Sequence, residues 1–310
     1  MPGVPPARYA YLGPEGTFCE QALRTLPAAE RADHLPCVSV ADALDVVRRG
    51  DAGGAVVPLE NSVEGSVAET LDELATGEPL QIVREVLLPV RFALMARSAT
   101  KLDQITTVTT MPHAEAQVRT WLRRELPQAR FIAAPSTADG ARAVAAGDAD
   151  AAVAAPIAAD RYRLQILADD IADTAGAVTR FVVVTRPGAP APPTGADRTT
   201  VMAFIRDDHP GALLELLTEF AVRGVNLTRI ESRPTGVGLG RYYFSIDAEG
   251  HISHARVAEA LAALRRECAD VRFLGSYPRA DGVAPAERAG TTDLDFSDAH
   301  AWVARLQSGH

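Results

Sequence analysis

A group of polar residues follows a short apolar segment near residue 57. In the stretch Val57-Pro-Leu-Glu-Asn-Ser, the residues Glu60, Asn61 and Ser62 come where a buried strand is expected to end. Gly65 follows closely and permits a tight approach of the backbone. A carboxylate, an amide and a hydroxyl at one strand end indicate a polar site, although a solvated loop tip has the same composition.

A second pair of polar residues precedes the apolar run Val182-Val-Val-Thr185. Thr179 supplies a hydroxyl and Arg180 a guanidinium, side by side where a buried strand is expected to begin. A guanidinium can hold a carboxylate through two parallel hydrogen bonds. By composition alone, the pair is more typical of an ordinary strand edge.

Two predicted helix starts offer further candidates. His113 and Gln117 are four residues apart at the start of one helix, so they share a face and can point into the same cavity. Thr17 and Glu20 have the spacing of a capping box that starts another helix. Free backbone amides near Gly16 would suit an anion. A solvated helix cap and a plain strand-to-helix turn are the alternatives.

Several classes of function are excluded by what the sequence lacks. It contains no Ser-His-Asp or Cys-His arrangement with a recognisable elbow, no phosphate-binding loop and no Gly-x-Gly-x-x-Gly turn. Cys19, Cys37 and Cys268 are too widely spaced for a disulfide framework or a zinc site. The net charge is −9 and the basic residues do not cluster, which argues against a nucleic-acid partner. We expect neither a metal nor a cofactor.

An internal repeat indicates how these residues are positioned. Ser39–Val56 matches Ser136–Val153 at nine of eighteen positions, with a constant offset of 97 residues. Each copy reads as a serine N-cap, a helix, a glycine stop and a buried strand. Two similar α/β lobes would meet in a cleft, where ligands commonly bind. One continuous sheet that contains both copies is the alternative.

The composition changes at Pro187–Asp197, a stretch rich in proline and glycine that reads as a linker. Before it, short apolar strands alternate with Ala-rich helices, which is typical of α/β layers. After it, the order strand, helix, two strands, helix, strand predicts a ferredoxin-like sandwich. The tail beyond Ala280 adds little core, apart from a short helix predicted at Ser297–Leu306 that carries Trp302.

The length of 310 residues and the apolar fraction of 47% are sufficient for two domains. No apolar run approaches the roughly 20 residues that span a bilayer. The proline-rich start, Met1–Pro6, has no hydrophobic signal core. We therefore expect a cytoplasmic protein.

Taken together, these motifs make the chain resemble prephenate dehydratase over residues 8 to 280. That family converts prephenate to phenylpyruvate, water and carbon dioxide in phenylalanine biosynthesis. The resemblance implies a two-lobed α/β catalytic domain, like type II periplasmic binding proteins, followed by a ferredoxin-like regulatory ACT domain that binds phenylalanine. The motifs that carry it are Gly13-Pro-Glu-Gly-Thr-Phe18, Pro58-Leu-Glu-Asn-Ser62 with Gly65, His113 with Gln117, Thr179-Arg-Phe181 and Glu231-Ser-Arg-Pro234.

The resemblance also implies boundaries and residue roles. The catalytic domain would cover residues 1–186, the linker 187–197, the ACT domain 198–280 and the tail 281–310. The implied catalytic residues are Thr179, Arg180, Glu60, Asn61, Ser62, His113 and Gln117, and the implied substrate contacts are Gly16, Thr17 and Phe181. The implied phenylalanine site consists of Gly211, Ala212, Leu213, Leu214, Asn226, Glu231, Ser232, Arg233 and Pro234.

Two motifs depart from the family pattern. The residues ahead of Thr179 read Ala175-Gly-Ala-Val178, where the family often has an asparagine. The first regulatory motif, Gly211-Ala-Leu-Leu214, usually ends in valine. Neither change affects the hydroxyl of Thr179, but the first removes an expected amide contact.

The chemistry of prephenate explains why no cofactor is expected. The substrate loses carbon dioxide and water together and becomes aromatic, so no free carbanion has to be stabilised. Hydroxide is a poor leaving group, and the resemblance points to Thr179 as the hydrogen-bond donor to it, with Glu60 or His113 as the proton source. The remaining expected contacts are Arg180 and the helix-start amides for the carboxylates, and Asn61, Ser62 and Gln117 for the ring.

Two other functions fit the same motifs. Arogenate dehydratase acts on an amino acid in place of the keto acid, and the sequence does not separate the two activities. A non-catalytic sensor of amino acids could use the same two lobes and the ACT domain. Because ACT domains resemble modules that pair side by side, we expect a homodimer or a homotetramer.

Overall fold

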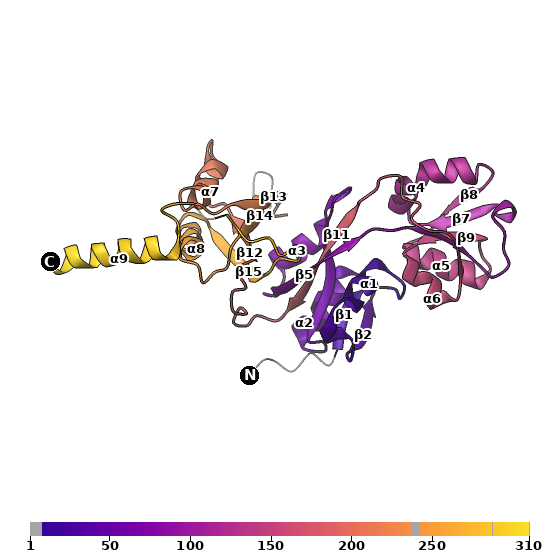
Figure 1. The fold of residues 1–310 in the computed structure, drawn as a ribbon, viewed down its shortest axis with the longest axis horizontal. Helices are drawn as coiled ribbons and strands as arrows, with labels where there is room; N and C mark the ends of the chain where they lie inside the picture. Colours follow the sequence, from indigo (N-terminus) through magenta and orange to yellow (C-terminus); the bar gives the residue numbers. More distant parts are fainter. Residues whose placement is uncertain (1–7, 237–241, 287, 310) are drawn as a thin grey trace. The chain divides into compact units, whose positions relative to one another are not determined.

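The computed structural model describes residues 8–236, 242–286 and 288–309 (Figure 1). Contacts divide the chain into two compact units. The first spans Met1–Glu73 and Val86–Val184, and the second spans Leu74–Glu85 and Thr185–His310.

Two sheets, each flanked by helices, belong mainly to the first unit, and only the end of α3 and the start of β5 fall within residues 74–85 of the second unit. The strands of the first sheet are β1 (Arg8–Leu12), β2 (Asp33–Cys37), β3 (Gly54–Asn61), β4 (Gly65–Ser66), β5 (Gln81–Pro89) and β11 (Val178–Thr185). Those of the second are β6 (Ala93–Ala96), β7 (Thr107–Thr110), β8 (Arg130–Ala133), β9 (Ala151–Ala154) and β10 (Gln165–Ala168). The helices are α1 (Phe18–Arg24), α2 (Val40–Arg49), α3 (Ala68–Thr76), α4 (Pro112–Glu125), α5 (Thr137–Ala146) and α6 (Pro156–Tyr162), with short 3-10 turns at Pro27–Ala29 and Leu102–Gln104.

The two sheets have the same topology. The first runs β2-β1-β3-β11-β5, and the second, read in the corresponding direction, runs β8-β7-β9-β6-β10. In both, the first three strands are parallel and the fourth is antiparallel to the third. The predicted two-lobed architecture is therefore confirmed, and the alternative of one continuous sheet is wrong.

Matching helix caps explain why the repeat folds twice in the same way. The side chains of Ser39 and Ser136 each accept a hydrogen bond from the backbone N–H three residues later, which starts α2 and α5. Gly50 and Gly147 end the two helices with φ of 83° and 94°, in the left-handed region that favours glycine. Each helix then leads directly into a buried strand, β3 or β9.

The second unit contains the predicted ferredoxin-like sandwich. Its sheet order is β13-β14-β12-β15, with antiparallel neighbours throughout. Both helices pack their apolar sides on one common core with this sheet. The elements are β12 (Asp197–Phe204), α7 (Ala212–Ala221), β13 (Leu227–Pro234), β14 (Tyr242–Glu249), α8 (Ala255–Glu267) and β15 (Asp270–Pro278).

The tail forms a longer helix than the sequence predicts. Helix α9 covers Asp293–Ser308 instead of Ser297–Leu306, because Thr292 and Asp295 cap its start reciprocally. Among the residues that the structure describes, no helix combines the length and the apolar character that a bilayer crossing requires.

The contacts of residues 74–85 differ from the simple order of two consecutive domains. This segment lies within the predicted catalytic domain, yet it groups with the second unit. Arg198 at the start of β12 forms a buried ion pair with Glu85 at 2.6 Å. Glu85 also accepts a hydrogen bond from the backbone N–H of Ala280, and Arg272 donates to the carbonyl of Gly77. Residues 74–85 thus contact the ferredoxin-like part of the second unit, although they precede β12 by more than a hundred residues.

Gly275 provides a test of this packing. Its φ of 134° is rarely adopted by other residues, and a β-carbon there would overlap the carbonyl oxygen of Ile82. We expect Gly275→Ala to destabilise the protein by about 1–3 kcal/mol. Gly188→Ala is the matched control, because a β-carbon at Gly188 has no neighbour within 4 Å. Equal thermal unfolding midpoints for the two variants would contradict the observed approach.

Candidate active site

Strands β3 and β11 bring two predicted site residues into direct contact. Thr179 lies opposite Asn61 in the antiparallel register. The amide Nδ2 of Asn61 donates to the hydroxyl Oγ1 of Thr179 at 2.8 Å. Thr179 is only 8% exposed, so its hydroxyl is held in place by this bond and by the surrounding sheet.

The hairpin that follows β3 fixes the direction of this hydrogen bond. The other amide atom of Asn61, Oδ1, accepts the backbone N–H groups of Val63 at 2.8 Å and of Glu64 at 3.0 Å. Nδ2 must therefore face Thr179, because the opposite orientation would place the NH₂ group against two donors. Since Oγ1 of Thr179 acts as the acceptor from Asn61, its own proton remains available for another partner.

Arg180 and Glu60 lie on the other face of the same sheet. Successive side chains of a strand point to opposite faces, so Arg180 is separated from Thr179, and Glu60 from Asn61. Arg180 is opposite Glu60 in the register and approaches its carboxylate to 3.7 Å. The side chains of Thr179 and Arg180 therefore point to opposite faces of the sheet, and the catalytic roles of Arg180 and Glu60 remain predictions.

Ser62 connects the hairpin to the strand that carries Thr179. Its backbone N–H donates to the carbonyl of Val178 at 2.9 Å, and its hydroxyl accepts the N–H of Val178 at 2.9 Å. These two bonds hold the residue before Thr179. In this arrangement Ser62 supports the position of β11, while its expected contact with a substrate ring remains a prediction.

Glu64 joins the hairpin to the second lobe, although no sequence motif marked it as a site residue. Its carboxylate accepts a hydrogen bond from Nε2 of Gln117 at 3.1 Å and lies 3.5 Å from Nδ1 of His113. Both partners are in the first turns of α4, on one face as their spacing predicts. The only signal in the sequence was the glycine after Glu64, Gly65, whose φ of 85° makes the tight hairpin turn.

The backbone of the loop before α1 is hydrogen-bonded to the carboxylate of Glu20, a residue of α1 itself. The N–H of Gly16 donates to Glu20 at 2.6 Å, and Thr17 donates to the carbonyl of Leu12 while it caps α1. The amide of Gly16 is therefore satisfied within the loop, which differs from the expected free anion site. A β-carbon on Gly16 would lie 3.2 Å from the backbone of Ala158, so this glycine lets the loop approach α6.

A buried ion pair between the lobes accompanies this approach. Glu20 is fully buried and bonds Arg161 of α6 at 2.6 Å. Burial raises the pKa of Glu20, but hydrogen bonds from Arg161, Gly16 and Arg24 outweigh it and lower the pKa overall. Phe181 is also buried, in the core of the first lobe, so its side chain does not reach a solvent-accessible site in this arrangement.

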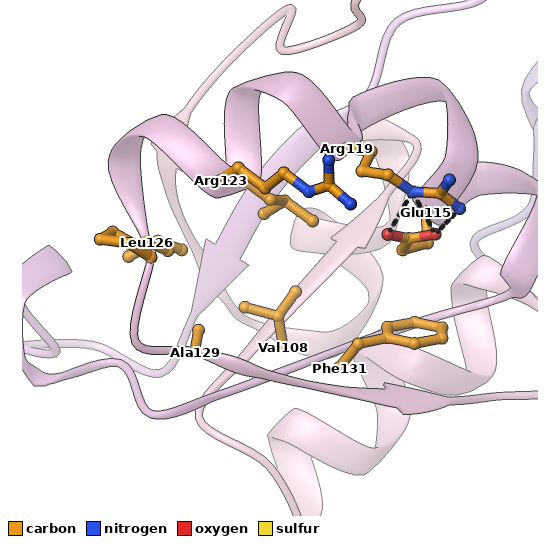
Figure 2. A pocket seen from close by; sticks show the side chains of 9 residues that line it. Val108, Glu115, Arg119, Arg123, Leu126, Ala129 and Phe131 are labelled. Carbon is orange, nitrogen blue, oxygen red and sulfur yellow. Dashed lines mark hydrogen bonds and ion pairs between the residues drawn. The ribbon is translucent and has the colours of Figure 1, made fainter.

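A separate pocket of about 200 Å³ lies in the second lobe between α4 and β8 (Figure 2). Apolar side chains such as Val108 and Phe131 line it, and the ion pair of Glu115 with Arg119 borders it. It includes none of the predicted site residues. The described pocket is thus distinct from the group around Thr179.

Comparison with protein families agrees with the motifs at this site. A family model described as prephenate dehydratase matches residues 9–189, and an ACT domain model matches residues 199–266. The chain belongs to the prephenate dehydratase family. The first match contains all of the residues contributed by β3, α4 and β11 to the site.

Relatives of the family match the chain over nearly its full length. A prephenate dehydratase of Amycolatopsis methanolica is 53% identical over 98% of this chain and 99% of the relative. The crystal structure of prephenate dehydratase from Arthrobacter aurescens in complex with L-Phe has a TM-score of 0.93 and 49% identity, and covers 97% of this chain and 99% of that one. GqqA, described as a novel type of quorum quenching acylase, has a TM-score of 0.80 and 30% identity, covering 88% and 98%.

Proposed function

We propose that this protein is a prephenate dehydratase, a carbon-oxygen lyase that converts prephenate to phenylpyruvate, carbon dioxide and water. The observation that carries the proposal is the buried hydroxyl of Thr179, which accepts from Asn61 and keeps its own proton available. Such a group can donate a hydrogen bond to an oxygen that leaves a bound molecule. Membership of the family supplies the identity of that molecule.

The reaction breaks two bonds of the substrate and consumes one proton. As the bond to the ring carboxylate breaks, its electron pair moves through the ring and expels the hydroxyl at the opposite carbon. The ring becomes aromatic, and the departing oxygen takes up a proton to form water. Thr179 stabilises the negative charge that develops on this oxygen, where a hydrogen bond gains most in strength.

The second lobe contributes donors for the anionic parts of the substrate. Gln117 and His113 both contact the carboxylate of Glu64, so the same face of α4 can bind a carboxylate of the substrate. We assign the proton to His113 in preference to Glu60, because Glu60 lies on the opposite face of the sheet from Thr179. Arg180 supports the sheet from that opposite face.

Incubation of the purified protein with prephenate tests this function directly. We expect phenylpyruvate to form, and conversion of arogenate to phenylalanine in the same assay would favour the arogenate dehydratase alternative. Binding of prephenate without turnover would favour the non-catalytic sensor. Turnover that persists in Thr179→Val would contradict the role given to the hydroxyl.

The likeness to GqqA makes an acylase activity the second candidate. An acylase that used Thr179 as its nucleophile would need a base to remove the hydroxyl proton. Asn61 instead donates to this oxygen, so the contact supplies no base. We therefore expect no hydrolysis of N-acyl amides, and hydrolysis that depended on Thr179 would overturn this assignment.

We further propose that phenylalanine binds the ACT domain and inhibits the enzyme. Gly211 precedes α7 with φ of 101°, and its β-carbon position has no neighbour within 4 Å, which leaves open space beside the helix start. Glu231 and Ser232 lie in the second half of β13. This strand runs in the same direction as β12, so both strands end at the same edge of the sheet. These positions support the predicted phenylalanine site.

Asn226 lies at the other end of β13, before Leu227. One binding site that contained both Gly211 and Asn226 would therefore combine opposite ends of the ACT fold. Two copies of the chain can meet this requirement when the site lies between them. This geometry supports the proposal of a homodimer or a homotetramer. Separately, a cytoplasmic location remains our expectation.

Ser232→Ala is expected to weaken inhibition by phenylalanine about 10-fold while leaving uninhibited turnover unchanged, because it removes one hydrogen bond to a charged ligand. Thr228→Ala on the same exposed side of β13 is the matched control. Gly211→Val is less suitable, because a valine at φ of 101° would strain the backbone. The measurement is the phenylalanine concentration at half inhibition, and identical values for wild type and Ser232→Ala would exclude Ser232 from the site.

A further inference from the structure

Helix α9 is attached to its unit by its first half. Asp293 accepts a hydrogen bond from the backbone N–H of Ala255 at 2.7 Å, and His300 lies 3.1 Å from the carboxylate of Glu259 on α8. Figure 1 shows the rest of the helix (yellow) projecting away from α8. All of its described side chains are exposed except that of Phe296, which is half-buried.

The exposed surface of α9 includes an ordered apolar stripe. Phe296, Ala299, Val303 and Leu306 follow one another at intervals of three, four and three residues, and Trp302 lies beside them. This spacing places them on one side of the helix, as in the contact seam of paired helices. Trp302 and Leu306 are each 56% exposed. Among the residues that the structure describes, only Phe296 of this stripe is half-buried. A 16-residue helix whose apolar side is otherwise exposed is marginal in water, so the stripe requires a cover.

The stripe is complementary to itself. Its spacing reads the same in both directions about residue 301, so two antiparallel copies place Phe296 against Leu306 of a second copy, and Ala299 against Val303. A contact of this kind is closed by a two-fold axis and uses the same surface on both chains. No other protein is needed to complete it.

The charges of α9 favour the same antiparallel arrangement. Asp293, Asp295 and Asp298 lie in the first half, and Arg305 lies in the last turn. Antiparallel pairing brings the acidic half near Arg305 of the second copy, whereas parallel pairing would bring the two acidic halves together. The antiparallel helix dipoles add to this preference. An anionic membrane surface is disfavoured as the cover, because the exposed acidic residues would be repelled.

We infer that α9 is a self-association helix, which pairs in antiparallel orientation with α9 of a second copy through Phe296, Ala299, Val303 and Leu306. The inference is independent of the proposed catalytic function. If the ACT domains also pair, contact through α9 doubles the number of chains in the assembly. Loss of the α9 contact then halves the mass of the particle.

The first test measures the mass of the full-length protein in solution. Val303→Glu and Leu306→Glu place a charge in the stripe, and Ala304→Glu places the same charge outside the stripe on the same turn. By light scattering coupled to gel filtration, we expect the two stripe variants to have half the mass of wild type, and Ala304→Glu to match wild type. Turnover per chain should be equal in all four proteins. Equal masses for all four, or a monomeric wild type, would overturn the inference.

The second test determines the orientation, and it remains decisive if the charged variants lose the helix. Chains with Ala299→Cys are mixed with chains with Val303→Cys and oxidised with diamide, which accepts the electrons of the two thiols. The natural cysteines are buried and serve as a background control in wild type. Antiparallel pairing links the two different chains, whereas parallel pairing links each variant to itself. A monomeric wild type that sediments with phosphatidylglycerol vesicles would identify a membrane as the cover instead.

Discussion

Replacing Thr179 by valine is expected to lower turnover of prephenate by about 100- to 10,000-fold, the usual cost of removing help from a general acid. Valine keeps the branched shape of threonine and fits the buried position between Asn61 and the neighbouring strands. What it removes is the donor to the departing oxygen. The fold and the affinity for phenylalanine should therefore remain unchanged.

Thr179→Ser is the matched control for this experiment. Serine keeps the hydroxyl and the hydrogen bond from Asn61, so a substantial share of the turnover should remain. The turnover number and the Michaelis constant are measured for both variants over a range of prephenate concentrations that reaches saturation. Equal losses in serine and valine would indicate that the methyl group and its packing matter, and the hydroxyl would lose its assigned role.

Asn61→Asp is expected to lower turnover by about 100-fold, although the two side chains have nearly the same shape. The introduced carboxylate still accepts the N–H groups of Val63 and Glu64, so the hairpin should persist. Its other oxygen can only accept from Thr179, so the hydroxyl proton that the departing oxygen needs is directed toward the carboxylate instead. The added negative charge also repels an anionic substrate.

The dependence on pH separates this explanation from a loss of structure. As pH falls, the introduced carboxyl takes up a proton, becomes a donor to Thr179 and loses its charge. The turnover of Asn61→Asp should therefore recover, relative to wild type, as the pH is lowered. A ratio of variant to wild-type turnover that is constant with pH would show that Asn61 does not direct the proton of Thr179.

Local sequence patterns predicted the order of helices and strands and the fold class well. The serine caps and glycine stops of the repeat, such as Ser39 and Gly50, are contacts within one helix, so sequence spacing alone defines them. The same holds for the ferredoxin-like order after the linker. The sequence also singled out Asn61 at the end of one buried strand and Thr179 at the start of another, and the structure brings them into hydrogen-bond contact, while their roles in catalysis remain predictions.

The geometry of the site depended on contacts that spacing does not define. Glu20 and Arg161 are 141 residues apart, and their ion pair between the lobes had no signal in the sequence. Glu64 reaches α4 because the hairpin turns at Gly65, which requires a three-dimensional path. The placement of Arg180 and Thr179 on opposite faces of the sheet could have been predicted from the sequence, because neighbouring side chains along a strand alternate between the two faces.

The position of Glu85 has a consequence for how this enzyme can evolve. A gene that ended after Arg186 would still encode residues 74–85 but would lack Arg198, Arg272 and Ala280, which contact them. Such a truncation removes the surface that buries this segment, and the loss of buried area costs stability. The ACT domain therefore cannot be deleted without destabilising the rest of the chain. Its deletion is a poor route to an enzyme that is no longer inhibited by phenylalanine. Escape should arise through point changes in the effector site, which leave the interlocked chain intact.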